Sequence, residues 1–354
     1  MALPAPDAPD APDAGRGAPD AAPLAREWRP PFPVDFRLVL SVHRRGSRDP
    51  AYRTGADGAV WRTSRTPDGP GTLRVTARPA GRDAAGTGPG ASASTRTGET
   101  GSSGAGAAAT LSVISATAWG PGAGWLLDAL PSQLGADDDP AGFTPVHPLL
   151  RELWRRHPGA RVGRSGRVLE ALVPAVLEQK VVGLEAHRAW RLLLLRFGDQ
   201  APGPAPAGMR VFPVAPRWLR IPSWEWHQAG VEAVRARTIA AAARVAGRVE
   251  EIMAMDPAGA DRRLRALPGV GPWTSAEIRQ RACGDADAVS VGDYNLPAAV
   301  GWALAGRVVD DAGMLQLLAP YRGHRYRAAR LIELSGARPP RHGPRMPVRD
   351  YRAF

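Results

Sequence analysis

The stretch Asp261–Gly284 reads DRRLRALPGVGPWTSAEIRQRACG and decides how the second half of the chain folds. Leucines three residues apart give its first part an apolar side, which predicts a short helix that ends at Pro268. Gly269 and Gly271 allow backbone conformations with positive φ and leave the nearby N–H groups uncovered. The residues from Trp273 onward have the pattern of another helix. The stretch therefore predicts two helices joined by a tight hairpin.

The predicted hairpin suits a phosphate group. Two glycines directly before a helix N-terminus present a concave set of backbone N–H donors to an anion. Such contacts position a protein on a nucleic-acid backbone without sequence preference, so Gly269, Val270, Gly271 and Thr274 are candidate DNA-binding residues. A monovalent cation that bridges hairpin carbonyls and phosphate would fit here. Taken alone, two glycines at this spacing are weak evidence for a phosphate site, and the alternative is an ordinary turn between two helices.

A carboxylate follows the hairpin, twenty residues after Trp273. It belongs to Asp293 in the stretch VSVGDYNLPAAV, where a helix over 293–304 is predicted. Aspartate is a favourable N-cap residue, so taken alone Asp293 is compatible with a purely structural role at the start of that helix. Gly292 precedes it, and no neighbouring carboxylate could replace it directly.

Charge and composition limit the classes of partner and cofactor. The formal net charge of +12 favours a polyanionic partner, of which nucleic acid is the commonest and a membrane surface is an alternative. The single cysteine, Cys283, excludes a disulfide within the chain, a four-cysteine zinc site and a cysteine-ligated iron–sulfur cluster. We therefore expect no metal site and no cofactor apart from the cation at the hairpin.

The sequence also gives an expectation about location. The N-terminus has no basic segment followed by an apolar one, and no stretch approaches 18 uninterrupted apolar residues. We expect a cytoplasmic, nucleoid-associated monomer that has no contact with a membrane and no obligate protein partner.

Composition along the chain predicts an α+β fold, with a mostly helical core and a small N-terminal antiparallel sheet. The expected parts are a disordered tail (1–25), an α+β sheet domain (26–140) with a low-complexity insertion (80–108), a helical core (141–335) that contains the helix-hairpin-helix motif (261–283), and a basic tail (336–354).

Local patterns predict the individual elements. Alternating or β-rich runs bounded by turn residues predict strands at Phe36–Val42, Ala59–Thr66, Thr72–Ala77 and Thr110–Thr117. Apolar residues at three- and four-residue spacing predict helices at 169–177, Leu184–Phe197 and Val231–Val249.

These motifs together resemble those of the helix-hairpin-helix DNA glycosylase superfamily, and in particular the AlkA-type branch of DNA-3-methyladenine glycosylase II. The hairpin LPGVG is similar to the signature of the superfamily, and the N-terminal strands suit the TBP-like sheet domain of the branch. Three further stretches resemble helices of the branch, namely VLEALVPAVLEQKVVGLEAHRAWRLLLLRFG (168–198), GVEAVRARTIAAAARVA (230–246) and PYRGHRYRA (320–328).

The resemblance implies a catalytic role for Asp293, because the superfamily presents one aspartate after the hairpin at the mouth of a base pocket. Trp273 and Tyr294 are implied as aromatic walls of that pocket, with core packing as the alternative for Tyr294. Trp273 stands where relatives that also cleave the strand carry a lysine that forms a Schiff base. A tryptophan cannot form that imine, so a monofunctional enzyme is implied.

Two positions depart from the pattern of the AlkA-type branch. Gln179 matches the glutamine of a turn that faces DNA, but the bulky apolar wedge that usually follows it is here Lys180, which can fill space and contact a phosphate. Either Val181 acts as the wedge or the geometry of base flipping differs. Glu277 stands where a second aromatic residue of the pocket is expected.

Arginines near the C-terminus are candidate phosphate contacts, with a solvated charged face as the alternative. They are Arg322, which belongs to the matched C-terminal helix, followed by Arg325, Arg327, Arg330 and those between Arg338 and Arg352.

The resemblance implies a monofunctional DNA glycosylase of base excision repair whose partner is double-stranded DNA with damaged bases. It would flip out an alkylated purine and hydrolyse the N-glycosidic bond while Asp293 stabilises a transition state like an oxocarbenium ion. Two alternatives are a non-catalytic helix-hairpin-helix DNA-binding protein and a glycosylase for oxidised or deaminated bases. Lys180 and Glu277 favour the non-catalytic alternative, and Asp293 argues against it.

Overall fold

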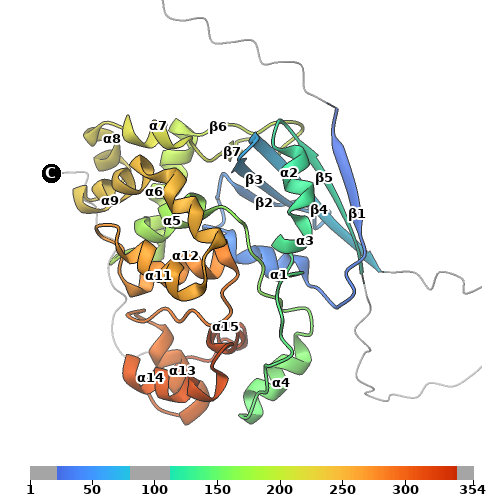
Figure 1. The fold of residues 1–354 in the computed structure, drawn as a ribbon, viewed down its shortest axis with the longest axis vertical. Coiled ribbons are helices and arrows are strands. Elements are labelled where there is room, and N and C mark those ends of the chain that lie inside the picture. Colours follow the sequence, from blue (N-terminus) through green and yellow to red (C-terminus); the bar gives the residue numbers. More distant parts are fainter. Residues whose placement is uncertain (1–21, 80–111, 341–354) are drawn as a thin grey trace, which may run out of the picture.

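The computed structural model describes residues 22–79 and 112–340 and has the predicted α+β architecture. A five-stranded antiparallel sheet lies on one side of the molecule and a larger helical part on the other (Figure 1). The predicted insertion at 80–108 falls outside the described residues, as do most of the predicted tails at 1–25 and 336–354.

The N-terminal part places five strands in the order β1-β5-β4-β3-β2. Its elements are β1 (Leu24–Trp28), α1 (Phe36–Leu40), the 3-10 turn η1 (Ser41–His43), β2 (Tyr52–Thr54), β3 (Val60–Thr66), β4 (Gly69–Pro79), β5 (Ser112–Trp119), α2 (Ala123–Asp128) and α3 (Leu130–Gln133). Pro79 at the end of β4 pairs with Ser112 at the start of β5. The chain therefore leaves the sheet and re-enters it at adjacent positions.

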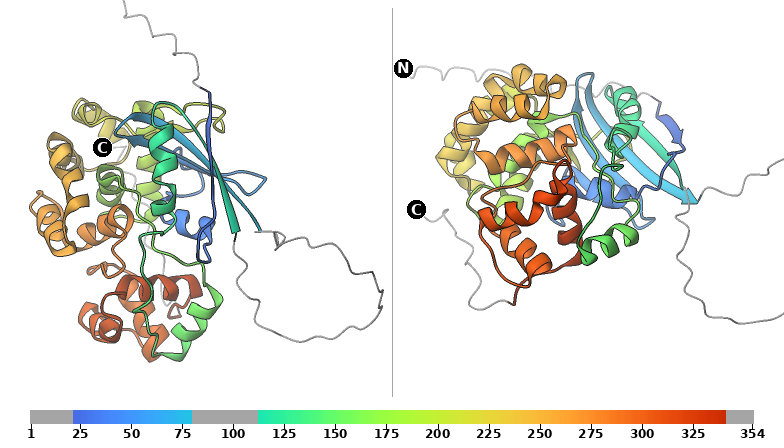
Figure 2. Two further views of the ribbon diagram at one scale, coloured as in Figure 1. Left: turned by 45° about the vertical axis from the view of Figure 1, so that its right-hand side comes forward. Right: turned by 60° about the horizontal axis from the view of Figure 1, so that its bottom comes forward.

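One face of this sheet packs against α1, α2 and α3. Alternate residues of neighbouring strands lie side by side, since Val75 of β4 pairs with Val60 of β3 and with Ala116 of β5. These residues form one buried apolar cluster with Phe36 of α1 and Leu126 of α2. Figure 2 shows the helices lying across the sheet in both views.

The prediction of a strand at Phe36–Val42 is wrong, because this segment forms α1 and η1. Phe36, Val39 and Leu40 are all buried, and their spacing of three and four residues is that of one helical face. The Asp35 carboxylate accepts a hydrogen bond from Leu38 N at 3.0 Å and so caps the helix. The predicted tail also extends too far, because β1 begins at Leu24.

The helical part contains the predicted helix-hairpin-helix motif. Its elements are α4 (Pro148–Arg156), α5 (Val168–Leu177), α6 (Gly183–Phe197), β6 (Asp199–Gln200), β7 (Arg210–Val211), α7 (Ala215–Leu219), α8 (Ser223–Gln228), α9 (Ala233–Arg244), α10 (Ala246–Glu250), η2 (Glu251–Ala254), α11 (Pro257–Arg265), α12 (Pro272–Ile278), the π-helical turn η3 (Arg279–Cys283), α13 (Leu296–Ala305), α14 (Asp311–Leu318), η4 (Ala319–Tyr321) and α15 (Arg325–Ser335). The helix predicted at Val231–Val249 is divided into α9 and α10 at Val245, whose backbone departs from helical geometry.

Two separate apolar clusters stabilise the helical part. The first surrounds α5, whose residues are almost all buried, and includes α6, α9 and α12. The second joins α4 to α13, α14 and α15, which lie together at the lower end of the molecule in Figure 1. The loop at 284–295 passes from α12 in the first cluster to α13 in the second. Any group on this loop therefore lies where the two clusters meet.

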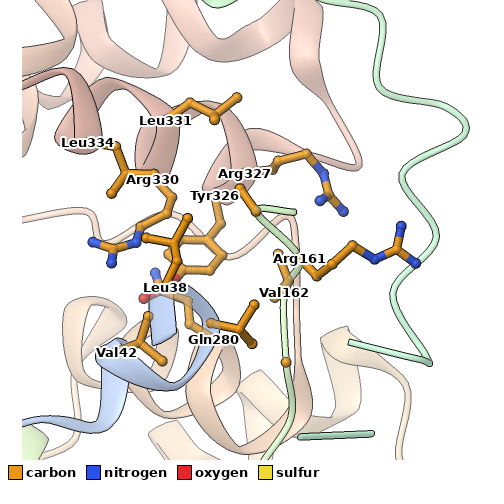
Figure 3. Close-up of a pocket in the computed structure, with 13 residues that line it drawn as sticks. Leu38, Val42, Arg161, Val162, Gln280, Tyr326, Arg327, Arg330, Leu331 and Leu334 are labelled. Carbon is orange, nitrogen blue, oxygen red and sulfur yellow. The ribbon is translucent and has the colours of Figure 1, made fainter. Parts of the chain in front are cut away.

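A buried ion pair joins the C-terminal helix α15 to the N-terminal part. The guanidinium of Arg327 contacts the carboxylate of Asp138, and each side chain is 2% exposed. This ion pair corrects the prediction that Arg327 contacts phosphate, because the guanidinium is buried and bound to Asp138. A cavity of about 30 Å³ lies beside it, where α1, the segment 160–163 and α15 meet (Figure 3). It has room for little more than water and contains none of the predicted catalytic or base-pocket residues.

Replacing Arg327 with Met should strongly destabilise the protein, because it leaves the buried Asp138 charge without its main partner. We expect the free energy of unfolding, measured by urea denaturation, to fall by about 3–5 kcal/mol. Arg155→Met is the control, since Arg155 pairs with Glu152 at the surface and is 77% exposed. Its loss should cost less than about 1 kcal/mol. Similar effects of the two substitutions would contradict the importance of the buried pair.

Candidate functional site

The hairpin between α11 and α12 presents its backbone to solvent. Pro268 and Gly269 are exposed. A Cβ at Gly269, whose φ is +85°, would come within 2.1 Å of the Thr238 hydroxyl oxygen, so only glycine fits this close approach to α9. A Cβ at Gly271 would meet no atom within 4 Å, so this side of the hairpin faces open space. The glycine backbone is therefore accessible to an anion.

Two of the predicted DNA-binding residues can offer only backbone atoms. Val270 is 6% exposed and packs in the apolar cluster around α5. Thr274 is 2% exposed, and its hydroxyl accepts a hydrogen bond from the side chain of Gln179 at 2.8 Å. Both side chains hold the hairpin in place, and the predicted contact with DNA through the backbone N–H groups stays a prediction.

Gln179 connects the turn after α5 to the hairpin. Its Nε2 donates one hydrogen bond to the carbonyl of Gly269 at 2.9 Å and another to the hydroxyl of Thr274. The turn and the hairpin, which are some ninety residues apart in the sequence, are thereby fixed side by side. Lys180 follows directly and is exposed next to this junction.

Asp293 is held by three N–H groups. Oδ1 accepts hydrogen bonds from the backbone N–H groups of Asn295 and Leu296, each at 2.8 Å. Oδ2 accepts one from the indole Nε1 of Trp273 at 3.0 Å. The N-cap of α13 is Asn295, because the helix begins at Leu296 and not at Asp293 as predicted. Asp293 lies two residues before this N-cap, and its Oδ1 binds the backbone N–H groups that lead into the helix. A carboxylate has about four acceptor positions, so one position on Oδ2 is left for another donor.

The aromatic residues predicted for a base pocket differ in their surroundings. Trp273 is half-buried, and its indole N–H points to the carboxylate of Asp293. Tyr294 is 89% exposed, which corrects the alternative that it packs in the core. An exposed tyrosine beside the carboxylate can stack on a planar ligand.

A buried network that the sequence analysis missed fixes the loop before Asp293. Glu277 is 9% exposed and accepts a hydrogen bond from Ser290 Oγ at 2.6 Å, while Gln280 Nε2 donates to the carbonyl of Ala288 at 2.9 Å. Arg281, one helical turn after Glu277, forms an ion pair with it. Glu277 therefore positions the loop and does not occupy a base pocket. The glutamate–arginine spacing of four residues is the signal that could have indicated this role.

The C-terminal helices hold the same loop from the other side. Gly292 N donates to the carboxylate of Asp311 at 3.1 Å, and Asp287 forms an ion pair with Arg325. Partial burial opposes ionisation of Asp287, but the hydrogen bonds and charge of Arg325 hold the pKa of Asp287 below its ordinary value. The guanidinium of Arg325 is therefore bound to the loop, and its contact with phosphate stays a prediction.

Arg322 is exposed at the end of η4, three residues before Arg325. It is not part of the contacts that join Gln179, the hairpin, Trp273 and Asp293. Arg330 pairs with Glu333 at the surface, and its predicted contact with phosphate stays a prediction.

The arrangement brings most of the predicted site together on α12 and its neighbours. Gln179, the hairpin, Trp273 and Asp293 form a continuous chain of contacts. These contacts place the exposed hairpin backbone, the side chain of Lys180 and the carboxylate of Asp293 on adjacent segments. Within residues 22–79 and 112–340, no group of three potential ligands could hold a metal ion, and no helix is both long and apolar enough to cross a membrane.

Comparison with solved structures shows which class of protein has this fold. The chain is similar over 88% of its length to 98% of a 3-methyladenine DNA-glycosylase from Archaeoglobus fulgidus, with a TM-score of 0.63 and 15% identity. It is also similar over 89% of its length to 97% of an 8-oxoguanine glycosylase/lyase from Clostridium acetobutylicum in its apo-form, with a TM-score of 0.60 and 10% identity. The fold is therefore the one found in helix-hairpin-helix DNA glycosylases, as the sequence predicts.

Comparison with curated proteins adds a sequence relationship. The chain is 33% identical over 174 residues to the probable bifunctional transcriptional activator/DNA repair enzyme AlkA of Mycobacterium tuberculosis. The match covers 48% of this chain and 32% of the relative, so the chain matches about a third of that relative's length. This confirms the predicted resemblance to AlkA. No protein-family model matches the chain.

Replacing Gln179 with Leu should loosen the hairpin, because both of its amide hydrogen bonds are lost. We expect faster hydrogen exchange at the backbone amides of Val270 and Gly271 and a loss of about 1 kcal/mol in stability. Gln228→Leu is the control, since the Gln228 amide contacts Arg196 at the surface and lies on α8. Unchanged exchange at the hairpin in Gln179→Leu would contradict the proposed connection.

Proposed function

We propose that the protein is a monofunctional DNA glycosylase of base excision repair that removes alkylated purines from double-stranded DNA. The observation that supports this most directly is the Asp293 carboxylate, fixed next to the accessible hairpin and left with an open acceptor position on Oδ2. The fold and the sequence match to AlkA agree with this function.

In the proposed reaction, the hairpin N–H groups hold the phosphate backbone next to the damaged nucleotide. The nucleotide turns out of the helix at a cost of a few kcal/mol, which is lowest for a damaged pair. Tyr294 offers an exposed aromatic face for a cationic base. DNA thus approaches the surface where α12 and α13 meet.

Breaking the N-glycosidic bond places positive charge on the sugar. The ionised Asp293 stabilises this charge, and its open Oδ2 position orients the attacking water. A purine alkylated at N3 or N7 carries a positive charge and leaves as a neutral base, so it needs little help from a general acid. Trp273 acts as a positioning residue, because its N–H fixes the carboxylate.

One observation favours a second candidate function. Asp293 Oδ1 accepts hydrogen bonds from the backbone N–H groups of Asn295 and Leu296 at the start of α13, so the residue could be retained for folding in a DNA-binding protein without catalysis. The two candidates differ in whether the wild-type protein releases a base from methylated DNA, and a catalytic role further requires that this release depends on the Asp293 carboxylate.

Replacing Asp293 with Asn should abolish catalysis, because the amide cannot stabilise positive charge. We expect release of 3-methyladenine and 7-methylguanine from methylated DNA to fall at least about 100-fold, with DNA affinity changed by only a few-fold. Asp310→Asn is the matched control, because the Asp310 carboxylate also accepts a backbone hydrogen bond at the start of a helix, from Gly313 N at 2.9 Å. It should release bases at the wild-type rate. Full activity of Asp293→Asn would contradict a catalytic role for this carboxylate, and absence of base release by the wild-type protein would support the second candidate.

Replacing Arg322 with Ala should remove one phosphate contact. The affinity for undamaged duplex DNA should fall with salt, and the slope of log K against log salt should become shallower by about 0.9 in the variant. Arg155→Ala, on α4, is the control and should keep the wild-type slope. An unchanged slope in Arg322→Ala would exclude a contact between this residue and DNA.

A further inference from the structure

The chain contains a single lysine. Of its 46 lysine and arginine residues, only Lys180 is a lysine, and all others are arginine. This lysine lies directly after Gln179, whose amide binds the hairpin, and its side chain is exposed. The only primary amine on a side chain of this protein is therefore next to the candidate DNA-binding surface.

The backbone at Lys180 is also unusual. Its φ is +55°, and it is the only non-glycine residue with positive φ in the part of the chain that the structure describes. A side chain in this left-handed region costs about 1–3 kcal/mol, and such residues are concentrated at functional sites. Glycine would fit this turn without strain. The turn therefore keeps a lysine side chain where the backbone disfavours one.

A positive charge alone does not account for a lysine here. Arginine binds phosphate well, through two parallel hydrogen bonds, and this protein uses arginine at every other basic position. What lysine has and arginine lacks is an amine that can lose its proton and form a covalent bond to carbon. The position therefore suits a carbonyl partner.

The reaction proposed above supplies such a partner. Removal of a base leaves an abasic deoxyribose, whose ring opens to expose an aldehyde at C1′. Asp293, which would face this sugar, is bound to Trp273, and the neighbouring Thr274 is bound to Gln179, next to Lys180 in the chain. The amine and the carboxylate thus lie on segments that α12 holds together.

We propose that Lys180 forms a reversible imine with the C1′ aldehyde of an abasic site and so retains the product of the reaction. The deprotonated amine adds to C1′, a nitrogen proton passes to the former aldehyde oxygen, and loss of water leaves a C=N bond. Addition of water reverses these steps and releases the aldehyde. Retention needs no strand cleavage. This inference rests on the proposed function, because it assigns the abasic product to the same site.

Trapping with borohydride tests this inference. The full-length protein is incubated with duplex DNA that already contains an abasic site, and sodium borohydride reduces any imine to a stable secondary amine. We expect wild type to give a covalent protein–DNA adduct that maps to Lys180 by mass spectrometry. Lys180→Arg, which keeps the charge, should lose at least about nine-tenths of the adduct. DNA with a tetrahydrofuran analogue, which lacks the aldehyde, should give none.

The double variant Lys180→Arg, Arg188→Lys is the matched control. Arg188 is exposed on α6, so this protein also has one lysine, but at a different place. It should not restore the adduct. An adduct of similar yield in either variant, or a wild-type adduct that maps to the N-terminal amine, would overturn the inference. Mapping the wild-type adduct keeps the test valid even if a variant folds poorly.

This test is independent of base release, because the abasic site is made beforehand. An adduct at Lys180 in a protein that releases no methylated base would support this inference and contradict the proposed function. Base release by a protein that gives no adduct would support the proposed function and contradict the inference about Lys180.

Discussion

The hydrogen bond from the indole of Trp273 to the carboxylate of Asp293 is the contact on which the candidate site depends. It joins two helical clusters with separate cores, since Trp273 begins α12 and Asp293 leads into α13. The same helix start also carries the hairpin and the hydroxyl that Gln179 binds. One short helix therefore fixes the relative positions of the backbone anion site, the lysine turn and the carboxylate. A shift at the start of α12 would change all three together.

The loop that carries Asp293 is held in place by hydrogen bonds from the helices on both sides of it. Glu277 and Gln280 hold it from α12 and η3, and Asp311 and Arg325 hold it from α14 and α15. The hydrogen bonds of Glu277 and Gln280 are buried and therefore costly to break, because each polar group would be left without a partner. The carboxylate therefore keeps its direction without a bound substrate, as stabilisation of a transient positive charge requires.

Local sequence patterns were sufficient to predict much of this arrangement. The hairpin glycines follow from their position between two helical patterns, and the long helices α5 and α6 follow from their apolar periodicity. Gln179 and the catalytic role of Asp293 were inferred from the resemblance to the AlkA-type branch. The short helix α1 was mistaken for a strand, because a five-residue helix is too short for its period to be distinguished from alternation.

The partners of charged residues could not be predicted in the same way. Arg327 and Arg325 were expected on the DNA-binding surface, but they pair with Asp138 and Asp287, which are distant in the sequence. Charge composition indicates how many cations a chain has, and only the fold shows which of them are already neutralised. Lys180 was noted as a departure from the family pattern, while its left-handed backbone became visible only in three dimensions.

The pairing of Pro79 with Ser112 has a consequence for how the chain can change in length. Because the two ends of segment 80–111 are fixed opposite each other by the sheet, the geometry of the fold does not depend on how many residues connect them. Closing a loop twice as long costs only about 0.6 kcal/mol more. The connection between β4 and β5 is thus a natural place for the gene to gain or lose codons, or for an experimenter to introduce a tag. These strands are separate from the helices that hold the carboxylate.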